Sequence, residues 1–495
     1  MTSTETASFK NKLGSVAPTP PKKRHWLSGI FIPLAWVLFI ANVGYVLFYV
    51  PNLPQWQLGG LIAINGLSTI MWLVVTFFSA IIQTYASNYL KGFKYKGKFL
   101  LVSFLFALSV MFFVVANNVV LFCASWLIMG YLMTLLIGIN TGWEEAKNAA
   151  RYARNNFIIS TVFLSLATGL LVFYTNAWTL TGIREGLPAL TKGVATLAAL
   201  GVLLAALIQS AIFPFHRWLM SAMTSPTPAS ALMHAGFVNA AGILLTIFAP
   251  LLVETQVLTL IFIIGSVTAI FSQFSKLLQV NIKQKLACST SAQMSFMIMQ
   301  CGLGFFSAAI THLILHGFYK AYLFLSSGEE IEKSIPKDAL PIQIKPIQTL
   351  FILVISGLGG VLFAYITGKG LAWDTGLFLT FIVAITVGQI TYNVLNHFRF
   401  SIVKKIIVLP FALAIGIGVY ALTYNGIALL LADMPMANKP IDLTYVHVLV
   451  GALFLLAFYV MLSGRYQKIP WLYVKLLNAS QPFNKSVISY KHNRS

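Results

Sequence analysis

The sequence predicts an all-α polytopic membrane protein with about fourteen transmembrane helices. The first observation is composition: 58% of the residues are hydrophobic and only 9% are charged, whereas a soluble domain is about 25% charged. A chain so poor in charge cannot cover a water-exposed surface. The second observation is spacing, because apolar runs of about 20 residues recur along the chain, and each can span about 30 Å of hydrocarbon.

The predicted spans follow one another with short connections. They are 28–50, 60–88, 98–117, 118–140, 155–175, 190–213, 227–253, 256–279, 286–304, 305–327, 347–367, 374–395, 404–431 and 443–463. The transmembrane domain is therefore expected at 28–463. A polar tail at 1–27 precedes it and a basic tail at 464–495 follows it.

Lysine and arginine residues are distributed unevenly between the two ends of these spans. With the N-terminus inside, 28 of the 33 lysines and arginines lie in inside segments and only four lie in outside loops. Cytoplasmic loops of membrane proteins carry such an excess. The bias predicts that both termini are cytoplasmic, and it accounts for the net charge of +21 by membrane orientation, without nucleic-acid binding.

The stretch 209–239 combines prolines with ionisable residues between two apolar runs. An apolar helix is expected to end at Pro214, and Pro226 and Pro228 interrupt the chain again before a helix that carries His234. Interrupted helices at membrane depth are tolerated where the freed backbone groups are buried in protein or line a water-filled cavity, as in ion-coupled transporters. This stretch therefore indicates ion or proton movement.

A second group of ionisable residues lies within the span THLILHGFYKAYLFLSSG. His312, His316 and Lys320 recur at every fourth position, so they share one face of a helix. Imidazole titrates near neutral pH, and a desolvated lysine loses its proton readily. These side chains are predicted to form part of a proton relay. The alternative is that each histidine is neutral and only hydrogen-bonded to a neighbouring helix.

Two further residues have two interpretations each. Lys283 opens the segment NIKQKLACSTSAQMSF and points either into the ion path or towards the inside surface as an anchor. His234 lies about two turns into its helix. It either carries a proton or makes a structural hydrogen bond that seals the interrupted segment.

Several kinds of functional group are missing from the sequence. None of the twelve carboxylates falls in the middle of a predicted span, where ion pumps usually place one. There is no phosphate-binding glycine loop, no cysteine and histidine metal set and no dinucleotide fingerprint. We therefore expect a coupling or transport subunit without catalytic residues or a cofactor of its own.

The chain resembles the antiporter-like membrane subunits of respiratory complex I and of multisubunit sodium/proton antiporters in FPFHRWLMSAMTSPTPASALMHA, IKQKLACSTSAQMSF and HGFYKAYLFLSSG. The resemblance covers roughly 60–400. It implies a pair of inverted repeats, each with a broken helix, around a polar axis of lysines and histidines. The residues that match this ion pathway are His234, Lys283, His312, His316, Lys320 and, as the lysine of the second broken helix, Lys369.

Two positions depart from that family. Its Gly-Trp-Glu motif matches ASWLIMGYLMTLLIGI, so the family's glutamate falls on Leu127. Its Gly-Lys-Ser-Ala motif matches LIQSAIFPF, so the family's lysine falls on Gln209. The glutamate–lysine pair that the family uses in its first half-channel is therefore absent, and proton pumping by that pair is not expected.

Within this superfamily the chain is most similar to the membrane subunits of the DAB inorganic carbon accumulation systems, in YASNYLKG and in TSPTPASALMHAGFVNAAGILL. This similarity implies a soluble, DabA-like zinc protein as partner on the cytoplasmic face of a bacterial inner membrane. A proton or sodium gradient would drive CO2 hydration to bicarbonate, with zinc on the partner. The alternative is a proton-translocating subunit of a complex I-like NADH:quinone oxidoreductase or of a multisubunit Na+/H+ antiporter.

Overall fold

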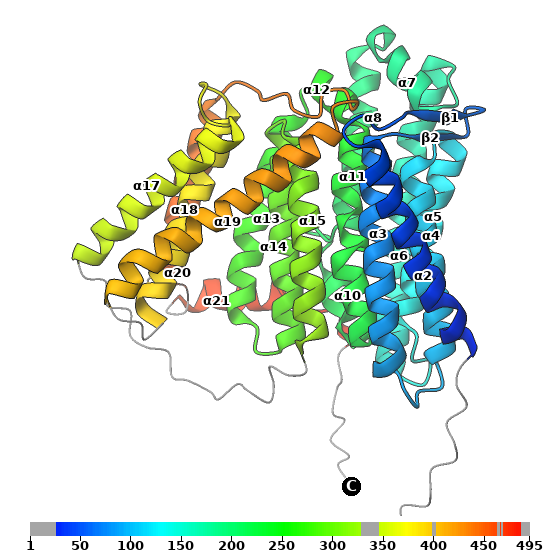
Figure 1. Cartoon of the computed structure of the whole chain (residues 1–495), viewed down its shortest axis with the longest axis horizontal. Coiled ribbons are helices and arrows are strands. Elements are labelled where there is room, and N and C mark those ends of the chain that lie inside the picture. The colour runs from blue at the N-terminus through cyan, green and yellow to red at the C-terminus, as the bar shows by residue number, and fades with distance from the viewer. Residues whose placement is uncertain (1–25, 328–345, 398–401, 463–465, 467–468, 487–495) are drawn as a thin grey trace, which may run out of the picture.

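The computed structural model describes residues 26–327, 346–397, 402–462, 466 and 469–486. The chain forms a row of long helices that run up and down between two sides (Figure 1). The first half contains α2 (Trp26–Tyr49), β1 (Trp56–Leu58), β2 (Ile62–Ile64), α3 (Gly66–Tyr89), α4 (Lys96–Val115), α5 (Val119–Ile137), α6 (Glu144–Thr175), α7 (Leu180–Gly186) and α8 (Lys192–Gln209).

The second half continues the same up-and-down pattern. It contains α9 (Arg217–Ser221), α10 (Thr227–Ala235), α11 (Ala240–Ile247), α12 (Ala249–Glu254), α13 (Leu258–Leu278), α14 (Ile282–Gly302), α15 (Phe306–Leu325), α17 (Pro346–Thr367), α18 (Thr375–His397), α19 (Ile402–Leu430), α20 (Tyr445–Leu462) and α21 (Pro470–Ala479). We call the side where α2 begins and α21 lies the inner side (Figure 1).

The structure confirms the predicted all-α membrane fold. Among the described residues, eleven helices are long and apolar enough to cross a membrane. The other three predicted spans correspond to α14, α15 and the shorter apolar helix α20. α14 and α15 are missing from the eleven because they carry lysines, histidines and hydroxyl side chains in place of apolar ones. Four of the six predicted ion-pathway residues, Lys283, His312, His316 and Lys320, lie in these two helices.

The break in the helical pattern lies at a different place from the one expected. Pro214, Pro226 and Pro228 all lie at the inner side, in or next to the connection 210–226 between α8 and α10. The helix that follows is interrupted farther along, where a short 3-10 turn at Phe237–Asn239 separates α10 from α11. The prolines therefore start this helix, and the interruption within it is at Gly236–Asn239.

The region around Lys369 also differs from the expectation of a second broken helix. A Cβ added at Gly359 would lie 3.0 Å from the Val387 side chain, and one added at Gly388 would lie 2.5 Å from Ser356 Oγ, so α17 and α18 pack closely side by side and antiparallel. Lys369 lies in the turn that joins them, after the positive-φ residue Gly368. The residue lies between two helices that form a hairpin, and not inside one interrupted helix.

Close packing joins α13 to α14, the helix with the predicted Lys283. An added Cβ at Gly265 would lie 2.7 Å from the Met299 backbone nitrogen, and one at Gly302 would lie 2.4 Å from the Phe262 nitrogen. Both positions require glycine, because any side chain would collide with backbone. Small residues allow this kind of close helix approach in membranes. The position of α14 beside α13 is therefore fixed along most of its length.

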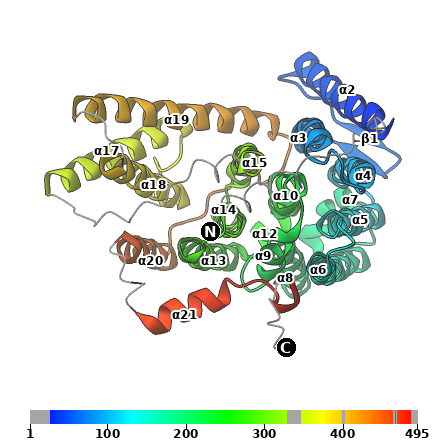
Figure 2. The ribbon, with the colours of Figure 1, turned by 90° about the horizontal axis from the view of Figure 1, so that it is seen from below.

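The apolar core is continuous in the first part of the chain and divided in the last part. One large cluster of buried side chains extends over α3 to α15. A smaller cluster joins α13, α14 and α15 to α18, α19 and α20 only near their outer ends, around Phe262, Phe305 and Phe378. The last helices consequently lean away from the rest of the bundle on the inner side (Figures 1 and 2).

The predicted basic tail contains a helix. The C-terminal segment 470–486, which comprises α21 and the residues after it, lies across the inner ends of the other helices (Figure 2). The His216 Nε2 atom is 2.8 Å from the Ala479 carbonyl oxygen, and the Phe483 amide donates to Ser221 Oγ over 2.8 Å. The Phe483 ring also stacks on Tyr152 at a centroid distance of 4.5 Å. This segment thus holds the 210–226 connection in place.

Candidate ion pathway

Lys320 is the most deeply buried charged side chain of the predicted group. Its exposed fraction is 0%, and it points from α15 to the first turns of α14. There Nζ donates to the Leu286 carbonyl oxygen over 3.1 Å and to Ser289 Oγ. A lone charge at the centre of a membrane helix costs about 2.5–3.5 kcal/mol on insertion scales. The hydrogen bonds recover part of this cost, and the exchangeable proton remains inside the protein.

His234 reaches the same part of α14 from the interrupted helix. It is fully buried. Its Nδ1 is 3.0 Å from Thr290 Oγ1, and its ring stacks on Phe324 at a centroid distance of 4.4 Å. Nε2 has no hydrogen-bond partner. Thr290 follows Ser289, which binds Lys320, so consecutive residues of α14 join the interrupted helix to α15.

Lys283 lies at the inner end of this group. Asn281 caps α14 by accepting hydrogen bonds from the amides of Lys283 and Gln284, which places Lys283 in the first turn. Its Nζ donates to the Ser225 carbonyl oxygen over 2.9 Å. Ser225 belongs to the connection that precedes α10. The side chain therefore points inwards and satisfies a backbone group that the irregular connection leaves free.

His316 and His312 continue the row along α15 in the direction away from Lys320. Their rings lie 6.1 Å apart, at an interplanar angle of 14°. Both ring nitrogens of His316 lack hydrogen-bond partners, as does Nε2 of His312. Neutral imidazole can accept a proton at one nitrogen and release one at the other. The spacing is too long for direct transfer, so a transfer along this row needs water or a ring movement between the groups.

Lys369 does not join this row. It is 4% exposed, its Nζ lacks a hydrogen-bond partner, and it lies 3.2 Å from the centroid of the Tyr424 ring and 5.1 Å from that of Phe305. Burial lowers the pKa of Lys369 to about 7. Aromatic faces stabilise a cation without accepting its proton. The side chain can therefore change its charge near neutral pH at the outer side.

The two positions that lack the family's charged residues have contrasting surroundings. Leu127 is 42% exposed on the outward face of α5, next to the buried Trp126, whose indole donates to Ser160 Oγ over 3.0 Å. Gln209 is fully buried at the end of α8, and neither its amide nitrogen nor its oxygen has a partner. These two side chains therefore face different environments and form no pair.

Several buried polar groups were not selected from the sequence. Asn239 donates to the Ala235 carbonyl oxygen over 2.7 Å, and its Oδ1 lacks a partner, so it occupies the interruption between α10 and α11. Gln300 of α14 is 2% exposed, with Oε1 unpaired. An amide inside a predicted span was the available signal for both. Within the described ranges, no three His, Cys, Asp or Glu side chains are grouped to hold a metal ion.

The chain has relatives among membrane subunits of known complexes. Residues 116–360 match the NADH:quinone oxidoreductase/Mrp antiporter transmembrane family. A probable inorganic carbon transporter subunit, DabB1, of Halothiobacillus neapolitanus is 36% identical over 305 residues, which are 58% of this chain and 54% of that protein. NADH-quinone oxidoreductase subunit L of Escherichia coli is 35% identical over 289 residues, which are 57% of this chain and 46% of that protein.

The fold has a counterpart among solved structures. A chain of the Mrp complex from Dietzia sp. superposes with a TM-score of 0.55 at 23% identity, over 91% of this chain and 49% of that chain. At this identity the likeness shows a common fold. The present chain spans about half the length of the curated relatives named above.

Proposed function

We propose that this chain conducts a cation, a proton or sodium, across a bacterial inner membrane, because residues 116–360 match the NADH:quinone oxidoreductase/Mrp antiporter transmembrane family and the relatives of the chain include DabB1 and subunit L. The ion gradient drives CO2 hydration and bicarbonate accumulation by a soluble, DabA-like partner that carries the zinc. The observation that carries the proposal is the buried row of Lys320, His316 and His312, which is linked through α14 to His234.

The contacts of this row support proton transfer better than a purely structural role. A structural histidine satisfies its ring nitrogens, whereas both nitrogens of His316 lack partners. Buried polar groups without partners are rare in proteins and need an explanation. Within the part of the chain that the structure describes, Lys320 has no acidic partner, and the only ion pair is between Lys147 and Glu144 at 3.3 Å. A chain of water and imidazoles that carries protons would supply the missing partners.

The inner side supports docking of a soluble partner. The exposed basic side chains there belong to the loop before α4 and to the first turns of α6, which include Lys91, Lys94, Lys147, Arg151 and Arg154. The partner in this proposal presents acidic residues to this surface. Such complementarity increases the rate of association and makes it sensitive to salt. The proposal places both termini in the cytoplasm.

Purification in mild detergent tests the proposal. We expect the tagged chain to retain one large soluble partner with bound zinc. Raising the salt concentration should release that partner, because the proposed interface is electrostatic. A variant with Arg151→Glu and Arg154→Glu should insert into the membrane normally and should retain less partner and less zinc. Recovery of the chain without zinc, under conditions that preserve the complex, would contradict the proposal.

The second candidate function is a subunit of a complex I-like oxidoreductase or a multisubunit antiporter. It is favoured by the 35% identity to NADH-quinone oxidoreductase subunit L. The exposed Leu127 and the unpaired Gln209 argue against it, because a glutamate–lysine pair cannot act at these positions. Recovery of several small membrane proteins, in place of one zinc protein, would support this second candidate.

A further inference from the structure

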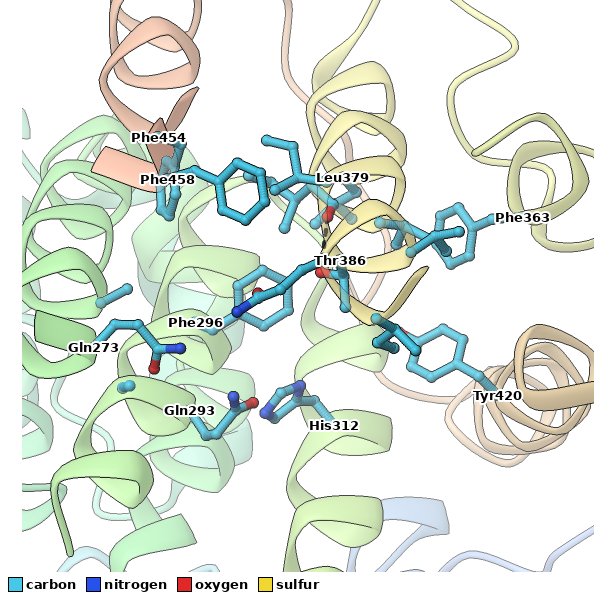
Figure 3. A pocket seen from close by; sticks show the side chains of 18 of the residues that line it. Gln273, Gln293, Phe296, His312, Phe363, Leu379, Thr386, Tyr420, Phe454 and Phe458 are labelled. Atoms are coloured by element: carbon cyan, nitrogen blue, oxygen red, sulfur yellow. Dashed lines mark hydrogen bonds between the residues drawn. The ribbon is translucent and has the colours of Figure 1, made fainter. Parts of the chain in front are cut away.

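A large cavity lies at the outer end of the histidine row. It has a volume of about 630 Å³, is partly open, and is bounded by α13, α14 and α15 on one side and by α17, α18, α19 and α20 on the other. Figure 3 shows His312 and Gln293 side by side at its edge and Phe296, Phe454 and Phe458 around it. The cavity exists because the last helices join the bundle only near their outer ends.

The lining is mostly apolar, with polar groups from α13, α14 and α15 in one wall and Thr386 and Gln389 of α18 in the other. The apolar part includes the Phe363, Phe454 and Phe458 side chains, and the polar part includes Gln293, Gln300 and His312. Two polar atoms in the wall formed by α14 and α15 have no hydrogen-bond partner in the protein, namely His312 Nε2 and Gln300 Oε1. Gln300 is 2% exposed. The wall therefore presents unpaired hydrogen-bonding atoms to an apolar space.

The size and charge of the cavity restrict what it can hold. Binding sites for small organic molecules measure about 300–1,000 Å³ and combine apolar walls with a few polar groups, which fits the present cavity. Carbon dioxide, the substrate in the proposed function, would leave most of this space empty. No Lys, Arg, Asp or Glu lines the cavity among the described residues, so a phosphate or another charged head group would be buried without a counter-charge.

We propose that this cavity binds a neutral lipid whose uncharged head carries hydrogen-bonding oxygens. A carbonyl oxygen of the head accepts a hydrogen bond from a side chain in the wall that contains His312, and a hydroxyl group of the head donates to Gln300 Oε1. The hydrocarbon part of the lipid lies against the phenylalanine side chains. The ligand enters from the bilayer, because Ile390 of the lining is 42% exposed at the protein surface. Quinone-type rings and neutral glycerolipids share this chemistry.

The location gives the ligand a consequence for ion movement. His312 is both the last member of the buried row and part of the cavity wall. A bound head occupies the space in which water would otherwise contact the imidazole. Occupancy therefore controls how His312 exchanges protons with its surroundings. The binding itself does not depend on the proposed coupling to CO2 hydration.

A matched pair of glycines in α19 allows a direct test. An added Cβ at Gly416 or at Gly418 meets no atom within 4 Å, but only Gly416 lines the cavity. Two positions along a helix differ by about 200° in direction, so Gly418 faces away. The full chain, as wild type, Gly416→Phe, Gly418→Phe and Gln300→Leu, is purified in mild detergent. Neutral lipids are extracted, identified by mass spectrometry and quantified per chain.

We expect a neutral lipid at a constant ratio to protein in the wild type and in Gly418→Phe. Gly416→Phe should reduce it about tenfold or more, and Gln300→Leu should reduce it while leaving co-purified phospholipid unchanged. A quinone ring or a glycerol ester in the extract identifies the source. If Gly416→Phe does not purify as a single species, Gln300→Leu decides. Equal neutral lipid in all the folded variants overturns the proposal, whatever the zinc measurement shows.

Discussion

Replacement of Lys320 by methionine should stop proton movement and leave the fold intact. Methionine has a similar length and no charge, so the substitution removes a desolvation cost of about 2.5–3.5 kcal/mol. It also removes the hydrogen bonds to the Leu286 carbonyl oxygen and to Ser289 Oγ, each worth about 1.5–3 kcal/mol for a charged donor. Together the two hydrogen bonds are worth about 3–6 kcal/mol, so after the removed desolvation cost the net destabilisation should be at most about 3.5 kcal/mol.

Arginine at the same position separates a proton relay from a structural charge. Arg keeps the positive charge and the hydrogen-bond donors, but it does not release its proton in proteins. If Lys320 acts only as a fixed charge, Lys320→Arg should restore function. If the residue passes a proton, both variants should reduce proton flux by about a hundredfold or more, as expected for loss of a proton-transfer group.

The assay is proton flux into proteoliposomes that contain the purified complex, followed with a pH-sensitive dye inside the vesicles. Thermal unfolding and the amount of retained partner are measured on the same preparations, so that a loss of flux is not confused with a loss of assembly. Wild-type flux in Lys320→Met would refute the relay. Wild-type flux in Lys320→Arg would show that Lys320 does not need to lose its proton.

Three further predictions follow from single contacts. Leu127→Glu should not produce Na+/H+ exchange in vesicles, because a carboxyl on this lipid-facing position has no partner and stays protonated; measured exchange contradicts this. Thr290→Val should lower the free energy of unfolding by about 1–3 kcal/mol, because it removes the hydrogen bond to His234. The control Thr246→Val removes only a hydrogen bond within its own helix. Equal shifts of the unfolding temperature in the two variants would argue against the His234 contact. Burial lowers the pKa of His216 below its usual 6.5, so the stability it gives is present above that pH and is lost as the pH falls through the folded-state pKa. The protection of the C-terminal segment against hydrogen exchange, relative to the intrinsic exchange rate at each pH, should fall on acidification in the wild type and fall less in His216→Gln.

The sequence was sufficient for the number of helices and for the shared face of His312, His316 and Lys320. Apolar runs of membrane length are local features, and a spacing of four residues fixes a common face once the segment is helical. The structure places Lys320 and His316 in the buried part of that face. Their role in conduction stays a prediction.

Other features depend on how distant segments pack, and the sequence did not reveal them. Prolines drew attention to the start of α10, whereas the interruption is at Gly236–Asn239, where a single glycine gave a weaker signal. The contact of His234 with Thr290 joins two helices far apart in the chain. The cavity beside His312 results from the divided core of the last helices, which no periodicity in the sequence encodes.

In the proposed function an ion gradient acts through Lys320 to drive bicarbonate accumulation. It is tested by measuring how much bicarbonate accumulates from supplied CO2 in inner-membrane vesicles that contain the complex, under an imposed pH or sodium gradient. We predict accumulation that requires the gradient, collapses when an ionophore dissipates it and is absent in Lys320→Arg with the partner still bound. Bicarbonate accumulation that is independent of the gradient, or equal in the wild type and Lys320→Arg, would contradict coupling through Lys320.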